Sequence, residues 1–451
     1  MTDLTIHEAA RKLAARNIRS TDLTRACLDR IAARDTTLNA FIAVLGDRAT
    51  ADAEQADREI DSGRYRGPLH GIPISLKDLI DLEGVPTTAA SRVRAHHVAC
   101  GDAPVAAALK AAGAVILGKT NLHEFAFGTT SEDSAYGPVR NPHDPSRSPG
   151  GSSGGSAAAV VAGMGLGSIG TDTGGSIRIP AAACGIVGLK PGAGELSCAG
   201  VVPLSWTLDN VGPLARSVTD AWILYEAMRG TPGRDIQPLD APPLHGVRLG
   251  VLGGYFVDFL EEGVRERFGE AVEALRAAGA SITHVQIPHA PLIPAIYLHL
   301  VLADAAAYHA EMLDAAFDQY TRAVALRISM GRYILAEDYA RARRGRAILR
   351  AHVDDCLERC SALLLPTLPI TAPKIGATVV ELGPKKDTLR NVMLRLTQPF
   401  NLTGHPAISL PCGGAVPPGG GAPLPVGLQI VGRRAGTIDL LRLARTIEEI
   451  V

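Results

Sequence analysis

The chain has 451 residues, of which 46% are hydrophobic, and its 45 Lys and Arg nearly balance its 46 Asp and Glu. This composition excludes a disordered chain and predicts a globular protein with a sizeable core. No basic run supplies the positive patch that nucleic-acid binding needs, so no nucleic-acid partner is expected. The longest apolar run, 157–170, is glycine-rich and shorter than the roughly 18 residues that span a bilayer, so no membrane partner is expected either.

The N-terminal segment and the cysteines bear on location and on metals. Residues 1–20 interleave charged residues with Leu and Ala and lack the apolar core of a signal peptide. Seven scattered cysteines without a CxxC pair are typical of reduced thiols, and we expect a cytoplasmic protein. Cys356 and Cys360 could share a helix face, but no His or Cys follows at ligand spacing, so no metal is expected.

The first part of the chain alternates predicted helices and strands. Apolar residues at three- and four-residue spacing predict helices over 5–15, 20–34 and 48–62, the second capped by Ser20 or Thr21. Short β-branched runs predict strands at 71–80 and 114–118, with a helix at 103–112 between them. This alternation is typical of a layered α/β fold.

Residues 141–191 are rich in Gly, Ser, Ala and Pro, a composition that linkers share. A linker does not carry an apolar stretch such as 156–169, which predicts a buried helix, nor end in a strand-like run at 185–189. A connection follows at 231–245. Beyond it we predict strands at 247–252, 281–287, 362–365, 407–410 and 426–431, a helix at 262–278 and a helical region at 293–360.

Strands on both sides of that connection favour one domain over residues 1–451, with a large mixed sheet between helices. Within it, 1–65 supplies N-terminal helices, 66–230 the core, and 231–451 the rest of the sheet and its covering helices.

The glycine-rich segment contains three candidate motifs. The GxGxxG at 165–170 follows a predicted helix rather than a strand, so it lacks the context of a dinucleotide fingerprint. No GK[ST] follows a glycine run, which excludes a P-loop. The GxSxG at 151–155 matches the nucleophile elbow of an α/β-hydrolase esterase, with Ser153 as nucleophile. An elbow needs a strand directly before its serine, whereas 141–149 holds three prolines.

A larger set of sequence blocks runs through most of the chain. These are GIPISLKD (71–78), GAVILGKTNLHEF (113–125), GGSSGGS (150–156), GTDTGGSIRIPA (170–181), CGIVGLKP (184–191), DNVGPLARSVTDA (209–221), LLLPTLPITAP (363–373) and QPFNLTGHPAISLP (398–411). Together they resemble the amidase signature family from about Leu69 onward. The resemblance implies the amidase-signature fold, an α/β/α arrangement, and a catalytic triad of Lys77, Ser152 and Ser176, with the peptide before Ser152 in the cis form.

The chemistry of these three residue types can be argued independently of the resemblance. A serine hydroxyl such as that of Ser176 is a poor nucleophile until a base takes its proton. Lys77 can be that base only if it is neutral, which requires burial that lowers its pKa from about 10.4. The apolar residues of 72–80 can provide such surroundings. The Ser152 hydroxyl both donates and accepts, so it can relay the proton between the other two side chains.

The residues before Ser176 carry the second half of the predicted site. Gly174 and Gly175 let the backbone turn its N–H groups toward a substrate carbonyl. The resemblance implies that they form an oxyanion hole together with Thr173. We predict that Asp172 and Arg178 form an ion pair that holds this loop. Structural roles are predicted for the other serines near the triad, which are Ser153, Ser156 and Ser168.

The resemblance covers several substrate classes, and two positions bear on the choice between them. In the A subunit of the tRNA-dependent glutamine amidotransferase, an aspartate that grips the α-amino group of glutamine aligns here with Leu394. Arg346 does align with the carboxylate-binding arginine of that enzyme, but it lies in a helix with many arginines. We therefore predict a stand-alone amidase or urethanase-like hydrolase.

The predicted substrate pocket is apolar and aromatic. Its proposed lining includes Phe125, Tyr136 and Trp206, together with Phe127, Leu204 and Leu208. Aromatic residues make up only 4% of the chain, so this local concentration favours an acyl or aryl group larger than that of glutamine.

The expected activity is hydrolysis of C–N bonds in linear amides other than peptides, through a Ser176 acyl-enzyme, with carbamates open as substrates. No cofactor and no metal are expected, and the expected partner is a small amide or carbamate, with a homodimer left open. The alternatives are an α/β-hydrolase-type esterase, an inactive homologue and the amidotransferase A subunit.

Overall fold

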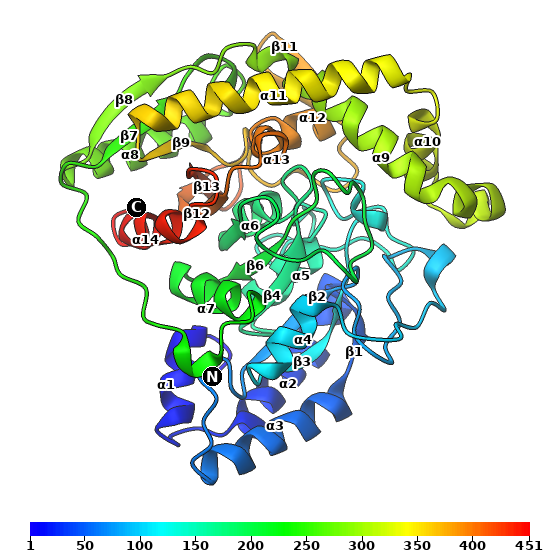
Figure 1. The fold of residues 1–451 in the computed structure, drawn as a ribbon, viewed down its shortest axis with the longest axis vertical. Coiled ribbons are helices and arrows are strands. Elements are labelled where there is room, and N and C mark those ends of the chain that lie inside the picture. Colours follow the sequence, from blue (N-terminus) through cyan, green and yellow to red (C-terminus); the bar gives the residue numbers. More distant parts are fainter.

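The computed structural model describes residues 1–451 and is built around one sheet of eleven strands (Figure 1). Their order is β1-β3-β2-β4-β6-β5-β12-β13-β9-β7-β8. The strands are β1 Phe41–Val44, β2 Pro73–Lys77, β3 Val115–Thr120, β4 Gly167–Thr171, β5 Val187–Lys190, β6 Val211–Ala215, β7 Arg248–Leu252, β8 Ser281–Val285, β9 Ala362–Pro366, β12 Ala407–Ala415 and β13 Leu424–Val431. A separate hairpin joins β10 Val379–Leu382 to β11 Lys385–Thr388.

The sheet is mixed and draws on both sides of the connection at 231–245. β2 pairs in parallel with β3 and β4, and β7 pairs in parallel with β8 and β9. The other neighbours in the sheet are antiparallel, including the β5–β12 pair that joins the two halves. The predicted α/β fold, with a large mixed sheet between helices, is confirmed.

Helices flank this sheet on both sides (Figure 1). They are α1 Ile6–Ala14, α2 Ser20–Leu38, α3 Gly46–Asp61, α4 Pro104–Ala111, α5 Gly154–Val161, α6 Arg178–Cys184, α7 Val218–Met228, α8 Glu262–Ala277, α9 Ile293–Ala316, α10 Arg322–Gly331, α11 Ala336–Arg359, α12 Leu389–Leu394, α13 Gln398–Thr403 and α14 Thr437–Glu448. A cluster of 123 buried hydrophobic residues runs continuously from α1 to α14. One core therefore serves strands from both halves of the sequence.

The first two helices are capped in different ways: α1 by residues next to it in sequence, and α2 by a residue of another helix. α1 begins with a capping box in which Thr5 and Glu8 satisfy each other's backbone N–H groups. The predicted cap of α2 by Ser20 or Thr21 is wrong. Both residues lie inside that helix, and their N–H groups donate to the Asp57 carboxylate of α3 at 2.7 and 3.1 Å. A carboxylate from a neighbouring helix thus replaces the local cap.

The predicted helix at 156–169 is correct only in its first half. α5 ends at Val161, and β4 begins at Gly167. Gly163 and Gly165 have φ angles of +73° and +158° in the turn between them, which no helix contains. β4 then gains hydrogen bonds from β2 on one side and β6 on the other, so sheet pairing outweighs the helical pattern of the sequence.

The predicted helical region at 293–360 divides into the three helices α9, α10 and α11, which form a layer at the top of the view in Figure 1. The helical stretch 290–319, which contains α9, is long and apolar enough by composition to cross a bilayer. However, 56% of its most apolar window is buried inside the molecule, where Tyr297, Val301 and Ala305 belong to the core. The stretch is thereby accounted for as a core helix.

Candidate active site

Lys77 is the last residue of β2, and its amine is enclosed by hydroxyl groups. Its side chain is 0% exposed, and Nζ lies 2.8 Å from each of Ser152 Oγ, Ser153 Oγ and Thr171 Oγ1. Burial lowers the pKa of Lys77 to about 7, although Asp172 and Asp209 act in the opposite direction. A neutral amine has two N–H donors and one lone pair, so one of the three hydroxyls can donate to it.

The sheet and one loop bring these hydroxyls to the lysine. β4 runs parallel to β2 with Leu76 opposite Ile169, which places Thr171 beside the end of β2. Ser152 and Ser153 precede α5 in a loop whose Gly151–Ser152 peptide is cis, as predicted. The Ser152 carbonyl accepts hydrogen bonds from the His123 N–H at 3.1 Å and the Ser131 hydroxyl at 3.2 Å. These contacts hold the loop against β3 and its following turn.

Sequence reasoning missed two residues of this cluster and underrated a third. Thr171 contacts the lysine directly, and Ser131 holds the serine loop by also accepting from the Gly154 N–H at 3.1 Å. Ser153, predicted to be structural, is as close to Lys77 as Ser152 is. Alternation along β4 could have identified Thr171 only if that segment had been predicted as a strand.

Ser176 lies beside this cluster on the loop between β4 and α6. It is 5% exposed, and its carbonyl accepts the Ser153 N–H at 3.2 Å, so the loops that carry Ser152 and Ser176 run next to each other. The backbone N–H groups of residues 173–176 donate to no protein atom. Four consecutive unused donors are rare in a buried segment and can bind a developing negative charge on a substrate oxygen.

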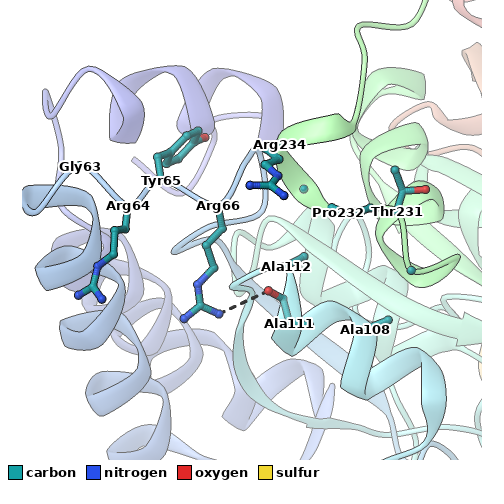
Figure 2. A pocket seen from close by; sticks show the side chains of 12 residues that line it. Gly63, Arg64, Tyr65, Arg66, Ala108, Ala111, Ala112, Thr231, Pro232 and Arg234 are labelled. Carbon is teal, nitrogen blue, oxygen red and sulfur yellow. Dashed lines mark hydrogen bonds between the residues drawn. The ribbon is translucent and has the colours of Figure 1, made fainter.

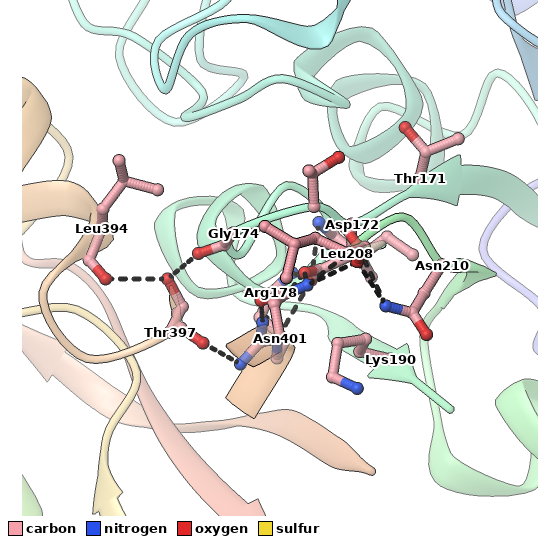
Figure 3. A network of polar contacts seen from close by, with 12 residues as sticks. Thr171, Asp172, Gly174, Arg178, Lys190, Leu208, Asn210, Leu394, Thr397 and Asn401 are labelled. Carbon is pink, nitrogen blue, oxygen red and sulfur yellow. Dashed lines mark hydrogen bonds and ion pairs between the residues drawn. The ribbon is translucent and has the colours of Figure 1, made fainter. Parts of the chain in front are cut away.

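Close packing explains why two glycines precede Ser176 (Figure 3). A Cβ on Gly174 would lie 2.4 Å from Tyr297 Oη and 3.0 Å from Leu394 Cδ2. Gly175 has φ +137°, and a Cβ there would lie 2.1 Å from Thr397 Oγ1. The Thr397 hydroxyl donates to the Gly174 carbonyl at 2.6 Å, which turns that carbonyl away from the unused N–H groups.

The predicted Asp172–Arg178 ion pair is confirmed and anchors this loop (Figure 3). Arg178 Nε and Nη2 donate to the two carboxylate oxygens at 3.0 and 2.9 Å, and both side chains are 0% exposed. Burial alone would raise the pKa of Asp172, but Arg178 and Lys190 outweigh it and lower the pKa to about 2. The remaining guanidinium donors reach the C-terminal part of the chain at Thr397, Asn401 and Gln429.

Comparison with known proteins decides the family. Residues 22–441 match the protein family described as Amidase. The chain belongs to the amidase family. An amidase from Pseudomonas putida is 40% identical to it, over 92% of this chain and 90% of that protein.

Two further relatives of this amidase-family chain are described with different functions. The A subunit of the glutamyl-tRNA(Gln) amidotransferase of Chloroflexus aurantiacus is 39% identical, over 98% of this chain and 95% of that protein. A solved structure of a vestigial protein complex, described as revealing the origins of an s-triazine catabolic enzyme, superposes with a TM-score of 0.92. It is 34% identical and covers 99% of this chain and 98% of its own. The family membership supports action on amide C–N bonds and leaves the substrate open.

The Asp172–Arg178 pair leads to a prediction about the stability of this amidase-family protein. Asp172→Asn removes the buried charge that compensates Arg178, and breaking such a pair typically costs about 3–5 kcal/mol. We expect a correspondingly lower midpoint of denaturant unfolding. As a control, Glu273→Gln breaks a surface pair with Arg276, in which the two side chains are 65% and 50% exposed, and is expected to cost under about 1 kcal/mol. Equal midpoints for the two variants would contradict the anchoring role.

Only some of the residues predicted to line the substrate pocket lie close to one another in the structure. Phe125 is buried and packs edge-on against His309, with 4.4 Å between ring centroids. His309 contacts Tyr308 at 4.9 Å, and Tyr308 contacts Trp206, which is 61% exposed, at 6.1 Å. A row of aromatic rings therefore runs from Phe125 in the core to Trp206 at the surface.

Tyr136, the third of the proposed aromatic lining residues, has no ring in that row. It is 38% exposed, and its backbone bonds to the side chains of Asn39 and Ser134. Leu204 lies elsewhere, in a narrow cavity beside Thr171 and Thr173. The Asp209 carboxylate in the same cavity accepts the Thr173 hydroxyl at 2.6 Å. Burial raises the pKa of Asp209 to about 6.

A wider hollow of about 650 Å³ lies away from the triad, between α3, α4 and the turn at 230–234 (Figure 2). Its lining contains Arg64, Arg66 and Arg234 but none of the residues that surround Lys77. Arg66 forms an ion pair with Glu59, with 2.7 Å between Nη2 and Oε1, so its positive charge is largely compensated within the protein. Because none of the residues around Lys77 line this hollow, we assign it no catalytic role despite its large volume.

The structure also bears on the elbow and amidotransferase alternatives. No strand precedes Ser153, and its hydroxyl is 0% exposed against Lys77, whereas an elbow presents its serine on a turn directly after a strand. Leu394 is buried against Gly174, so an apolar side chain lies where the amidotransferase resemblance requires an aspartate. Arg346 donates to the Leu402 and Thr207 carbonyls at 2.7 and 2.9 Å and so ties α11 to α13 and to the loop that contains Thr207.

Proposed function

We propose that the protein is a stand-alone amidase that cleaves C–N bonds through an acyl-enzyme on Ser176. The observation that carries the proposal is the buried Lys77 amine, with a pKa near 7, in contact with the hydroxyl of Ser152. An amine in this state can accept a proton at neutral pH, which an exposed lysine cannot do. The unused N–H groups of 173–176 supply the second requirement, a place for the oxyanion.

Acylation proceeds in two linked movements. The Ser176 hydroxyl attacks the substrate carbonyl carbon, while its proton passes to the Ser152 oxygen and the Ser152 proton passes to the Lys77 amine. The carbonyl oxygen becomes an oxyanion that receives hydrogen bonds from the backbone of Thr173, Gly174 and Gly175. The C–N bond then breaks as the same relay, run in reverse, delivers a proton to the leaving nitrogen.

Deacylation uses the same groups. Water takes the place of the departed amine and loses a proton to the relay as it attacks the acyl carbon. Collapse of the second tetrahedral intermediate frees the acid and returns the proton to Ser176. A carbamate substrate follows the same route: breaking its C–N bond releases the amine and leaves an alkoxycarbonyl group on Ser176, so linear amides and carbamates are both within reach of this chemistry.

A substrate panel tests the proposal. Purified protein is incubated with anilides, primary aliphatic amides, ureas and carbamates, and release of the amine or ammonia is followed for each class. We expect hydrolysis of at least one class without added metal or cofactor. If no class is cleaved and a fluorophosphonate probe does not label the protein, the proposed activity is wrong and the inactive homologue is favoured.

A second candidate function is that of the A subunit in a glutamine amidotransferase. It is favoured by the 39% identity to the corresponding protein of Chloroflexus aurantiacus. That function requires glutaminase activity and assembly with a further protein that handles the tRNA. An isolated chain that hydrolyses other amides but not glutamine would exclude it, and copurification with such a tRNA-handling protein would support it.

A further inference from the structure

Two arginines from different helices lie on one aromatic ring near the catalytic loop. Arg327 is on α10 and Arg390 on α12, and their guanidinium carbons lie 5.3 and 5.7 Å from the centroid of the Phe127 ring. Arg327 donates to the Phe127 carbonyl. Arg390 Nε is buried without a hydrogen-bond partner. Neither guanidinium forms an ion pair within the protein.

These arginines are close to the loop that carries the unused N–H groups. Leu394 contacts the position of Gly174, and Arg390 lies one helical turn before Leu394 on α12, so the two side chains share a face of that helix. Tyr297, from α9, brings its hydroxyl against the same glycine. That hydroxyl forms no hydrogen bond within the protein either.

The electrostatics show that these three side chains form one group. Burial lowers the pKa of Arg390, and the only ionisable group that opposes this is Tyr297. Burial and then Arg390 lower the pKa of Arg327 to about 10, with Asp133 and Tyr297 acting in the opposite direction. Asp133 is itself 3.2 Å from the ring of His123. No carboxylate of the protein is thus placed to neutralise both arginines.

Two partly buried cations that form no ion pair are costly, and so are buried donors without acceptors. Arginine forks match the two oxygens of a carboxylate, and a tyrosine hydroxyl can add a third hydrogen bond. The same positive charge repels an ammonium group. The buried Leu394, on the same face of α12 as Arg390, offers such a group no acid.

We propose that Arg327, Arg390 and Tyr297 form a subsite for a carboxylate of the substrate, next to the scissile bond. The inference rests on the proposed amidase function and narrows its substrate class. The substrate is then a small amide, urea or carbamate that bears a carboxylate and lacks an α-ammonium group.

The test compares matched substrates in matched variants. Succinamate carries a carboxylate, and butyramide replaces that carboxylate by a methyl group. The wild-type protein is expected to favour succinamate in kcat/KM, and Arg390→Gln is expected to lower this preference roughly 10- to 100-fold, the usual value of a hydrogen-bonded charge contact. Arg390→Lys keeps the charge and should restore part of the preference. Arg395→Gln is the control, because Arg395 stacks on the ring of Tyr255 at 3.9 Å and donates to the Tyr255 carbonyl rather than contacting Phe127.

A binding measurement keeps the two proposals separable. Succinate is titrated calorimetrically into Ser176→Ala protein with and without Arg390→Gln, so that no turnover is needed. Loss of succinate binding only in the double variant supports the subsite. Equal binding in both proteins, or a wild-type preference for butyramide that Arg390→Gln leaves unchanged, overturns it even if amide hydrolysis itself is found. Failure of fluorophosphonate labelling would instead count against the catalytic proposal.

Discussion

Ser176→Ala is expected to abolish turnover and covalent labelling by a fluorophosphonate probe. Removing the nucleophile of a catalytic unit typically lowers kcat by about 10⁶-fold, because the remaining groups have nothing to activate. The measurement is kcat on the best substrate of the panel, together with mass spectrometry of the probe-labelled protein. The adduct on the wild-type chain is expected on the peptide that contains Ser176.

The matched control for this prediction is Ser168→Ala. Ser168 is also a buried serine, but its hydroxyl bonds to Ser75 at 2.8 Å rather than to Lys77. We expect it to leave labelling intact. Full activity in Ser176→Ala, or an adduct on Ser153 in the wild-type protein, would mean that the GxSxG motif supplies the nucleophile after all.

Lys77→Met is the substitution with the next largest expected effect. It removes the base while keeping a long apolar side chain, and loss of general-base catalysis costs about 10²- to 10⁴-fold. The pH profile identifies the cause. Since the pKa of Lys77 is about 7 and only the neutral amine accepts a proton, wild-type kcat/KM should rise as pH increases through 7 and level off above it. The variant should retain a low rate without that rise.

The free energy of unfolding of Lys77→Met shows whether the variant is inactive because it lacks the base or because it does not fold. The pKa of an unfolded lysine, 10.5, exceeds the folded value of about 7, so the unfolded chain binds more protons between these pH values. Burying the amine therefore lowers the free energy of unfolding at neutral pH, and this penalty fades as pH rises toward 10.5. Lys77→Met should be at least as stable as the wild type at pH 7 in chemical denaturation. An inactive variant with a much lower midpoint, or an unchanged pH profile, would contradict the assignment.

The sequence was most informative where chemistry and spacing coincide. Lys77, Ser152 and the glycines before Ser176 carry a pattern that predicts both the family and the grouping of the lysine with a serine. Thr171 could not be predicted, because its contact with Lys77 depends on the parallel register of β4 against β2. The apolar, small-residue run 156–169 resembles a helix throughout, and only the pairing of β4 with its neighbours ends that helix early.

Contacts between residues from distant parts of the chain could not be predicted from the sequence either. Arg327 and Arg390 are 63 positions apart and meet only because the fold brings both guanidinium groups to the ring of Phe127. The capping of α2 by Asp57 has the same origin, since a local rule selects Ser20 but a neighbouring helix supplies a stronger acceptor. Aromatic composition suggested a single apolar pocket, whereas the rings extend in a row to the surface.

The four contacts of the Arg178 guanidinium have a consequence for how the enzyme is made. A nascent chain contains every residue of the proposed triad once Ser176 has been synthesised, yet the acceptors at Thr397, Asn401 and Gln429 emerge from the ribosome more than 200 positions later. Until then the loop that ends at Ser176 lacks these three anchors. We therefore expect no activity from a chain that ends before Thr397, whether it is still being synthesised or has been released as an N-terminal fragment.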